Sequence, residues 1–524
     1  KFGYSGLLVA DSVSWESLDL EGKKAHLEQR LDLAIAKGAT VIRLGNVSPN
    51  PLARESIEVD GERDWALADF FVQRVKERGL QFCATLPELV KSSGLSGYKA
   101  FLSKLIERYD GDADFGVAEV DVNQEHPDVD GSGSVTFADW GADNGTKKAW
   151  AVERKLDLIE IGDQPHVAET AGELAKTDYL LQLEAVYAVL NETGATTPVM
   201  LGTTAADNQS QGTFQTRFEG IDPASAPLSA VSGAFDDAFA DISGDKAVEK
   251  IEGFFGWAGS IGYPDTERWI GSMRVGGTEC VDTRCGERLK ASLIVKAVLT
   301  ALHKGYGTIL YGDPIMPSGS SEQSGKHTAA LWNYESDAVL GGDVEMASRP
   351  ATDVWLVLVD VLAQVDLADI ELMPGDNPLV VGYKVGDKGW IYWYNWTRQV
   401  GPGESYSGKE FQARLDGLEL PAIKVATLWK EEGDVEWPYE TIVVEDGSAT
   451  FMVGQDVMWV TATDAPPTAP DLAESDDLGT TPDSAPTTPI KDDGCSAHHG
   501  TSPWGLSVLV LIILLRRRTQ TRRA

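Results

Sequence analysis

The sequence is poor in basic side chains. Its 524 residues hold 45 Lys and Arg against 81 Asp and Glu, a formal net charge of −36. A surface of that sign repels a phosphate backbone, so nucleic acid is not expected as a partner. Cysteine is scarce too, and four residues in a chain of this length exclude a disulfide-rich scaffold. The composition is otherwise globular, 42% hydrophobic and 24% charged, and the length allows two or three domains.

Long hydrophobic runs are lacking as well. The apolar segment at 503–515, PWGLSVLVLIILL, has 13 residues, and a helix of that length spans about 20 Å against a hydrocarbon core of roughly 30 Å. It is a poor permanent span and fits a transient anchor better. Five arginines follow it and are expected to stay cytoplasmic, which places the preceding chain outside. The Pro-, Thr- and Asp-rich stretch at 463–493 predicts a disordered linker.

The last segment, 494–524, contains Gly494-Cys495, the short apolar helix and the Arg cluster. This order, behind a linker, resembles the myxobacterial C-terminal sorting tail. The resemblance implies recognition by sorting and processing machinery and cleavage near Cys495. The protein would then be exported and displayed at the cell surface or outer membrane, or released after processing. An ordinary tail anchor is the alternative, and in both cases only this segment contacts a membrane.

The other cysteines fit an exported protein. Cys280 and Cys285 lie five residues apart in a loop-like stretch, where a local disulfide is sterically reasonable in an oxidising compartment. That pair alone is not a zinc site. Cys83, in the apolar run LQFCATL, is predicted to be a buried strand residue.

Residues 1–365 alternate short apolar strands with amphipathic helices, which indicates a parallel α/β fold. No Gly-rich phosphate loop follows the first strand, so a dinucleotide-binding fold is not favoured. We predict a (β/α)8 TIM barrel. Its strands are expected at 2–10, 40–45, 80–86, 155–162, 197–203, 267–275 and 306–312.

Residues 366–462 show alternating strands with turn dipeptides and no helical stretch. This pattern predicts a small antiparallel β-sandwich after the barrel. Its strand at 390–396 carries aromatic side chains on both faces. Core packing or a domain interface explains these aromatics as well as ligand binding does.

Several motifs of the barrel region resemble one enzyme family. Segment 53–86 has a Trp- and Asp-rich turn, a helix, Gly-Leu and a new strand, and IEIGDQP at 159–165 is similar to the strand-four motif W-E-I-G-N-E-P. Arg43 in VIRLG matches a strand-two arginine. These features resemble the clan of retaining glycoside hydrolases with (β/α)8 barrels, whose β-xylosidase- and cellulase-like members include some with a terminal β-sandwich. The resemblance implies a polysaccharide or glycan as partner.

The two catalytic glutamates of that clan are replaced here. Gln164 stands at the acid/base position and Ser272, in WIGSMR, at the nucleophile position. Retaining hydrolysis needs two carboxyl groups about 5 to 5.5 Å apart, and an amide has no proton to donate. Strand alternation predicts that Asp163 points away from Gln164, while Glu160 shares its face at greater depth. Glu279, in a following loop, is the candidate replacement.

Other side chains are expected to contact a sugar through hydroxyl groups or by stacking near strand ends. The candidates are Arg43, Asp163, Trp140, Trp257, Tyr311 and Trp332. Packing is the alternative for each aromatic residue. Arg43 is also a buried charge that needs a carboxylate or carbonyl partner, and loss of the nucleophile removes the partner that the clan provides.

Three functions stay open on this evidence. Gln164 and Ser272 favour a cell-surface, glycoside-hydrolase-like protein that binds carbohydrate without efficient hydrolysis. An active glycosidase would have to recruit another carboxylate such as Glu279. An inert structural barrel would have no affinity for glycans.

A possible calcium loop lies at 128–139, DVDGSGSVTFAD. Its oxygen-bearing residues fall at positions 1, 3, 5, 7, 9 and 12 of an EF-hand-like loop, with glycine at position 6. They are Asp128, Asp130, Ser132, the Ser134 carbonyl, Thr136 and Asp139. A plain acidic loop is the alternative. We expect any bound Ca²⁺ to be structural and the chemistry to require no cofactor.

Overall fold

The computed structural model of the chain is described over part of its length. The described residues are 1–8, 15–45, 49–59, 62–113, 127–129, 132, 135, 145–165, 177–205, 224, 226–235, 245–275, 283–316, 331–333, 347–348, 350–375, 377, 379–394, 410–429, 437–454 and 456–464. The predicted sorting tail at 494–524, and the predicted linker beyond residue 464, lie outside them. Among the described helices, none combines the length and apolar character needed to cross a membrane.

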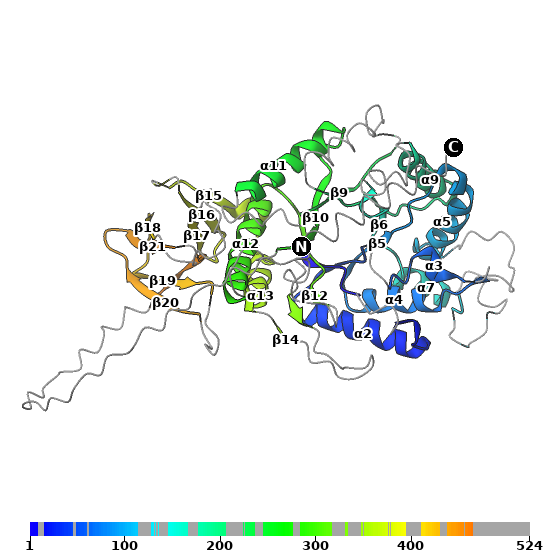
Figure 1. Cartoon of the computed structure of the whole chain (residues 1–524), viewed down its shortest axis with the longest axis horizontal. Helices are drawn as coiled ribbons and strands as arrows, with labels where there is room; N and C mark the ends of the chain where they lie inside the picture. Colours follow the sequence, from blue (N-terminus) through cyan, green and yellow to red (C-terminus); the bar gives the residue numbers. More distant parts are fainter. Residues whose placement is uncertain are drawn as a thin grey trace, which may run out of the picture. The chain divides into compact units, whose positions relative to one another are not determined.

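Eight parallel strands close into a barrel, which confirms the predicted fold class (Figure 1). In chain order they are β1 (Phe2–Ser5), β2 (Val41–Arg43), β5 (Gln81–Leu86), β6 (Leu158–Ile161), β7 (Val199–Leu201), β9 (Ala230–Ala234), β10 (Glu267–Met273) and β11 (Thr308–Gly312). Each pairs with the next, β11 pairs with β1, and the pairing of β9 with β10 completes the ring. All eight carboxyl ends therefore meet at one end of the barrel.

Helices connect the strands and lie outside them (Figure 1). They are α2 (Leu20–Ala36), α3 (Arg54–Ile57), α4 (Ala66–Glu77), α5 (Leu95–Tyr109), α7 (Gly145–Glu153), α9 (Asp178–Thr193), α11 (Asp245–Ser260), α12 (Thr283–His303) and α13 (Pro350–Leu362), with 3-10 turns at Ser92–Gly94 and Leu367–Asp369. Asp19 caps α2 by accepting a hydrogen bond from Gly22 N at 2.8 Å. Gly38 ends the same helix with a φ of +75°, a left-handed conformation that glycine adopts without strain.

Other short strands lie in the barrel region. β3 (Glu58–Val59) pairs with β4 (Glu62–Arg63), and β8 (Thr204–Ala205) pairs with β9 of the barrel. A three-stranded sheet contains β12 (Ile315–Met316), β13 (Trp332–Asn333) and β14 (Ala347–Ser348).

The barrel interior begins with an apolar layer that takes one residue from each of seven strands. Its members are Val41, Cys83, Leu158, Met200, Ala230, Trp269 and Leu310. Cys83 is fully buried with a free thiol, as expected, and burial raises the pKa of that thiol.

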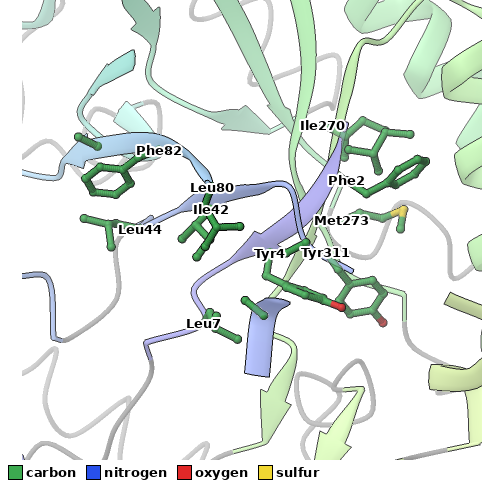
Figure 2. Packing of buried hydrophobic residues seen from close by; sticks show 14 of the residues in the cluster. Phe2, Tyr4, Leu7, Ile42, Leu44, Leu80, Phe82, Ile270, Met273 and Tyr311 are labelled. Carbon is green, nitrogen blue, oxygen red and sulfur yellow. The ribbon is translucent and has the colours of Figure 1, made fainter. Parts of the chain in front are cut away.

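Side chains on the outer face of the strands pack against the helices. Figure 2 shows Phe2 and Tyr4 of β1 near Tyr311 of β11 within this outer core. The ring of Trp355, on α13, lies 5.3 Å from that of Tyr311, and its indole N–H donates to the Tyr4 hydroxyl at 3.1 Å. The outer core thus anchors the last described barrel helix to the first and last strands.

The C-terminal strands form a β-sandwich. A six-stranded antiparallel sheet contains β15 (Ile370–Met373), β16 (Val380–Val385), β17 (Trp390–Tyr394), β22 (Met458–Thr463), β19 (Ala422–Thr427) and β20 (Tyr439–Val443), in that order. The pair β18 (Phe411–Asp416) and β21 (Ser448–Val453) packs against one of its faces.

The aromatic strand β17 is buried on both faces. Tyr392 and Tyr394 lie in the core between the two sheets, whereas Trp393 joins the core shared with the barrel. The Trp393 ring stacks on Tyr383 at 5.3 Å, and Tyr383 contacts His303 of α12 edge-on at 5.5 Å. Core packing and the interface with the barrel therefore account for these aromatic residues.

Candidate functional site

A polar layer lies directly above the apolar layer, toward the carboxyl ends of the strands. On five strands, a small or apolar inward-facing residue is followed two positions later by a polar one. These pairs are Gly3 and Ser5, Val41 and Arg43, Cys83 and Thr85, Leu158 and Glu160, and Ala230 and Ser232. Because residues i and i+2 of a strand share one face, each of these polar side chains is directed into the barrel.

Arg43 is the centre of this layer and is only 2% exposed. Its Nε and Nη2 donate to the two carboxylate oxygens of Glu160 at 2.7 and 2.8 Å, and Nη2 also donates to Asp163 Oδ1 at 2.6 Å. Nη1 donates to Ser5 Oγ at 2.7 Å and to the Gly271 carbonyl at 3.4 Å. Burial by itself would lower the pKa of Arg43, but the negative charges of Asp163 and Glu160 outweigh it and raise that pKa.

Glu160 is fully buried and its hydrogen-bonding capacity is used within the protein. Besides Arg43, it accepts hydrogen bonds from Thr85 Oγ1 at 2.6 Å, from Thr203 N at 2.8 Å and from Thr203 Oγ1 at 2.6 Å. Thr203 Oγ1 also lies 2.8 Å from Ser232 Oγ. A carboxylate held in this way orders the strand ends and does not face a ligand.

The expected orientation of Asp163 is wrong. Strand alternation placed it on the face opposite Gln164 and Glu160, yet Asp163 and Glu160 bind the same guanidinium group. The reason is that β6 ends at Ile161, and Gly162 takes a φ of +69°. The two-residue period therefore does not extend to Asp163 or Gln164.

Gln164 follows the fourth barrel strand in a strained conformation. Its φ is +47°, unusual for a residue with a long side chain, and its backbone N–H donates to the Thr203 carbonyl at 2.9 Å. The side chain is half-buried. The residue predicted at the acid/base position thus places a half-buried amide at this strand end.

Ser272 lies on the seventh barrel strand at a β-bulge. The register of β10 against both neighbours shifts between Ile270 and the following residues. The bulge directs Gly271 and Ser272 both inward: a Cβ atom on Gly271 would lie 2.0 Å from Ser232 Oγ, and one on Gly312 would lie 2.2 Å from Ser272 Oγ. Ser272 is 6% exposed, so this strand end presents a small, nearly buried hydroxyl beside a glycine.

Two of the predicted stacking residues are in the wrong place for a sugar. Trp257 is 5% exposed on α11 and packs against Phe254, with ring centres 5.3 Å apart. Tyr311 is fully buried on the outer face of β11 against Trp355. Both rings complete the core between strands and helices, which is the packing alternative.

The remaining predicted residues are placed only in part. Trp332 lies on β13, and the structure does not describe its side chain. Cys285 lies in the first turn of α12. Trp140, Glu279, Cys280 and Cys495 lie outside the described residues.

Two of the six candidate ligands in the possible calcium loop, Asp128 and Ser132, are described. Ser132 N donates to Asp128 Oδ1 at 3.2 Å. Asp130, Ser134, Thr136 and Asp139 lie outside the described residues. Within the described part of the chain, no group of three or more His, Cys, Asp or Glu side chains could hold a metal ion.

The sequence reading missed the hydroxyl ring of Ser5, Thr85, Thr203 and Ser232. A signal was present: on five strands a small or apolar inward residue is followed two positions later by a hydroxyl or charged residue. Because residues two positions apart share one face of a strand, this recurring pattern predicts a polar layer at one end of the barrel.

Comparison with known proteins shows what this architecture resembles. No protein-family model and no curated protein matches the sequence. Among solved structures, a 4-O-α-L-rhamnosyl-β-D-glucuronidase from Fusarium oxysporum 12S has a TM-score of 0.51 at 13% identity over 88% of this chain and 95% of its own. A family 39 glycoside hydrolase from Bacteroides cellulosilyticus WH2 has a TM-score of 0.52 at 10% identity over 85% of this chain and 79% of its own.

A monomeric β-xylosidase from Caulobacter crescentus CB15 gives a TM-score of 0.50 at 12% identity and covers 88% of this chain and 95% of its own. The chain therefore has a glycoside-hydrolase-like fold, a closed barrel followed by a β-sandwich. At such low identity the likeness establishes the fold, and the function has to be argued from the site.

Proposed function

We propose that the protein binds carbohydrate at the C-terminal end of its barrel and does not hydrolyse it efficiently. The fold supports a glycan as ligand, because the three solved structures named above are enzymes that act on glycosides. The half-buried amide of Gln164, at the end of the fourth strand, supplies a donor and an acceptor of the kind that bind sugar hydroxyl groups.

One observation carries the proposal: the ends of the fourth and seventh strands hold Gln164 and Ser272. Retaining hydrolysis requires an acid that protonates the leaving oxygen and a carboxylate that attacks the anomeric carbon, about 5 to 5.5 Å apart. Neither an amide nor an unactivated hydroxyl replaces them. Glu160 and Asp163 are both bound to Arg43, so they cannot form a pair across the sugar.

An active glycosidase remains the competing function if a loop carboxylate such as Glu279 enters the site. The test is to incubate the full chain, with calcium, with a panel of polysaccharides and aryl glycosides, and to measure reducing-sugar release and binding by calorimetry. We expect binding without turnover. Turnover that disappears in Glu279→Gln would replace this proposal by the glycosidase, and a folded protein with neither activity would support an inert structural role.

The C-terminal sequence supports display of this barrel at the cell surface. We propose export, with membrane contact through 494–524 alone. Protease treatment of intact producing cells tests this proposal. Surface display predicts that the protease removes the barrel, whereas a barrel protected from the protease would contradict surface display.

Calcium is proposed as a structural ion in the loop at 128–139. The Asp128 carboxylate that accepts from Ser132 N is consistent with a turn of that kind. A rise in melting temperature with added Ca²⁺, lost in Asp128→Ala, is the expected result, and a melting temperature independent of Ca²⁺ would refute it.

A further inference from the structure

A second ion pair lies at the same end of the barrel and is more accessible than the first. Arg274 directly follows β10 and Asp313 directly follows β11, and Arg274 Nη1 lies 3.0 Å from Asp313 Oδ2. Their side chains are 20% and 40% exposed, compared with 2% and 0% for Arg43 and Glu160. This pair therefore presents charged hydrogen-bonding groups to solvent, where the inner cluster does not.

The outer pair adjoins Ser272 through Gly312. A Cβ atom on Gly312 would lie 2.2 Å from Ser272 Oγ and 3.2 Å from Arg274 Cγ, so the missing side chain lets both residues pack against this strand end. Gly271, next to Ser272, accepts from Arg43 at 3.4 Å. The outer pair thus adjoins the buried inner cluster at this end of the barrel.

Asp313 holds its place in a strained backbone conformation. Its φ is +44°, and its N–H donates to the Ser5 carbonyl at 2.9 Å. The other non-glycine residues with positive φ in the described chain are Ala113, Gln164 and Asp446. Two of these four therefore follow barrel strands at the candidate site. Strained residues are commonly retained where they position a functional group.

The charges around Ser272 indicate which glycans fit. Among the described residues here, the ion-paired groups are Arg43 and Arg274 and the carboxylates of Glu160, Asp163 and Asp313, which together carry a net charge of −1. The whole chain carries −36. A uronate or sulfated sugar would be repelled by this surface.

Building on the proposed function, we propose that Arg274 and Asp313 bind the hydroxyl groups of a neutral glycan beside Ser272. A guanidinium donates and a carboxylate accepts, while each sugar hydroxyl does both, so an adjacent Arg–Asp pair is suited to two neighbouring hydroxyl groups. Neither charge has to be neutralised by the ligand. The ligand class is therefore an uncharged polysaccharide or oligosaccharide.

The test compares Asp313→Asn and Arg274→Met with the unaltered full chain by calorimetric titration of neutral and uronate-containing oligosaccharides. Asparagine tolerates a left-handed backbone, so Asp313→Asn changes the charge with little effect on the fold. We expect each variant to lose about tenfold in affinity for the neutral glycan, as for a hydrogen bond to a charged group. Melting temperatures confirm folding.

The matched control is Asp416→Asn. Asp416 forms an exposed ion pair with Arg414 at 2.7 Å on the sandwich, away from the barrel strand ends, and its substitution should leave affinity unchanged. If the unaltered chain binds neutral glycans and both barrel variants bind equally well, this inference fails alone. Tighter binding of uronate sugars would also refute it. If the unaltered chain binds no glycan, the proposed function fails and this inference fails with it.

Discussion

Arg43 illustrates how a buried charge is satisfied inside a barrel. A buried guanidinium is costly unless carboxylates or carbonyls satisfy it. Here Nε and Nη2 donate to Glu160 at 2.7 and 2.8 Å, and Nη2 also donates to Asp163 Oδ1 at 2.6 Å. Two carboxylates thus share the one guanidinium group of the Arg43 cluster.

The buried side chain of His26 makes the stability of the fold sensitive to low pH. It is 2% exposed on α2, with its ring 5.6 Å from that of Trp15. Burial, assisted by the charge of Arg30, lowers the pKa of His26 to about 4. Since an unfolded histidine has a pKa of about 6.5, the unfolded state binds more protons between these values, and stability falls as pH drops from about 6.5 to about 4.

Replacing His26 by Phe should remove this part of the pH dependence, because phenylalanine preserves the aromatic contact and cannot be protonated. The contribution of the histidine is about 3 kcal/mol between pH 7 and pH 4, for a shift of about two and a half pKa units. Denaturant unfolding of both proteins at several pH values measures it. Parallel curves of stability against pH for the two proteins would show that His26 does not contribute.

At the scale of elements, β9 shows why one barrel strand escaped the sequence reading. Its sequence AVSGA contains small residues with weak strand preference. Ala230 belongs to the interior layer with Trp269 of the neighbouring strand. A small residue is required here because the interior has a limited volume and the indole ring occupies much of it.

Ala230→Leu should therefore destabilise the barrel by overpacking, at a cost of about 1–3 kcal/mol in the free energy of unfolding. Ala462→Leu is the control, because Ala462 is exposed on β22 and its substitution should change stability by no more than about 0.5 kcal/mol. Urea unfolding of both variants and of the unaltered protein measures these changes in stability. If Ala230→Leu is as stable as the unaltered protein, the interior can accommodate the larger side chain.

At the scale of the whole molecule, the barrel and the sandwich belong to one compact unit, Lys1–Pro467. Their apolar residues form a common cluster that includes Trp355 of the barrel and Trp393 of the sandwich. Arg288 of α12 also forms an ion pair with Asp456, just before β22. A shared core of this kind should make the two parts unfold together.

We expect a single calorimetric transition for residues 1–467 within the full chain, with equal calorimetric and van't Hoff enthalpies. Trp393→Ala removes the aromatic contact at the shared core and should separate the transitions, with a loss of about 3–5 kcal/mol. Tyr392→Ala, on the opposite face of β17, should lower the melting temperature while leaving one transition. Two transitions in the unaltered protein would contradict the cooperative picture.

Most of the architecture could be predicted from local sequence patterns. Strand and helix periodicity identified the parallel barrel, and the strands after residue 366 identified the sandwich, because both patterns are local and repeat along the chain. The identity of the residues at positions 164 and 272 was also a matter of sequence alone.

Which side chains share the site depends on how distant segments pack. The tertiary structure directed Asp163 toward Arg43, because β6 ends at Ile161 and strand alternation stops there. It placed Trp257 and Tyr311 in the core, and it joined Arg274 to Asp313 across 39 positions of the chain. Such contacts depend on strand length, bulges and the closure of the barrel, which are set by the packing of distant segments and leave no local pattern in the sequence.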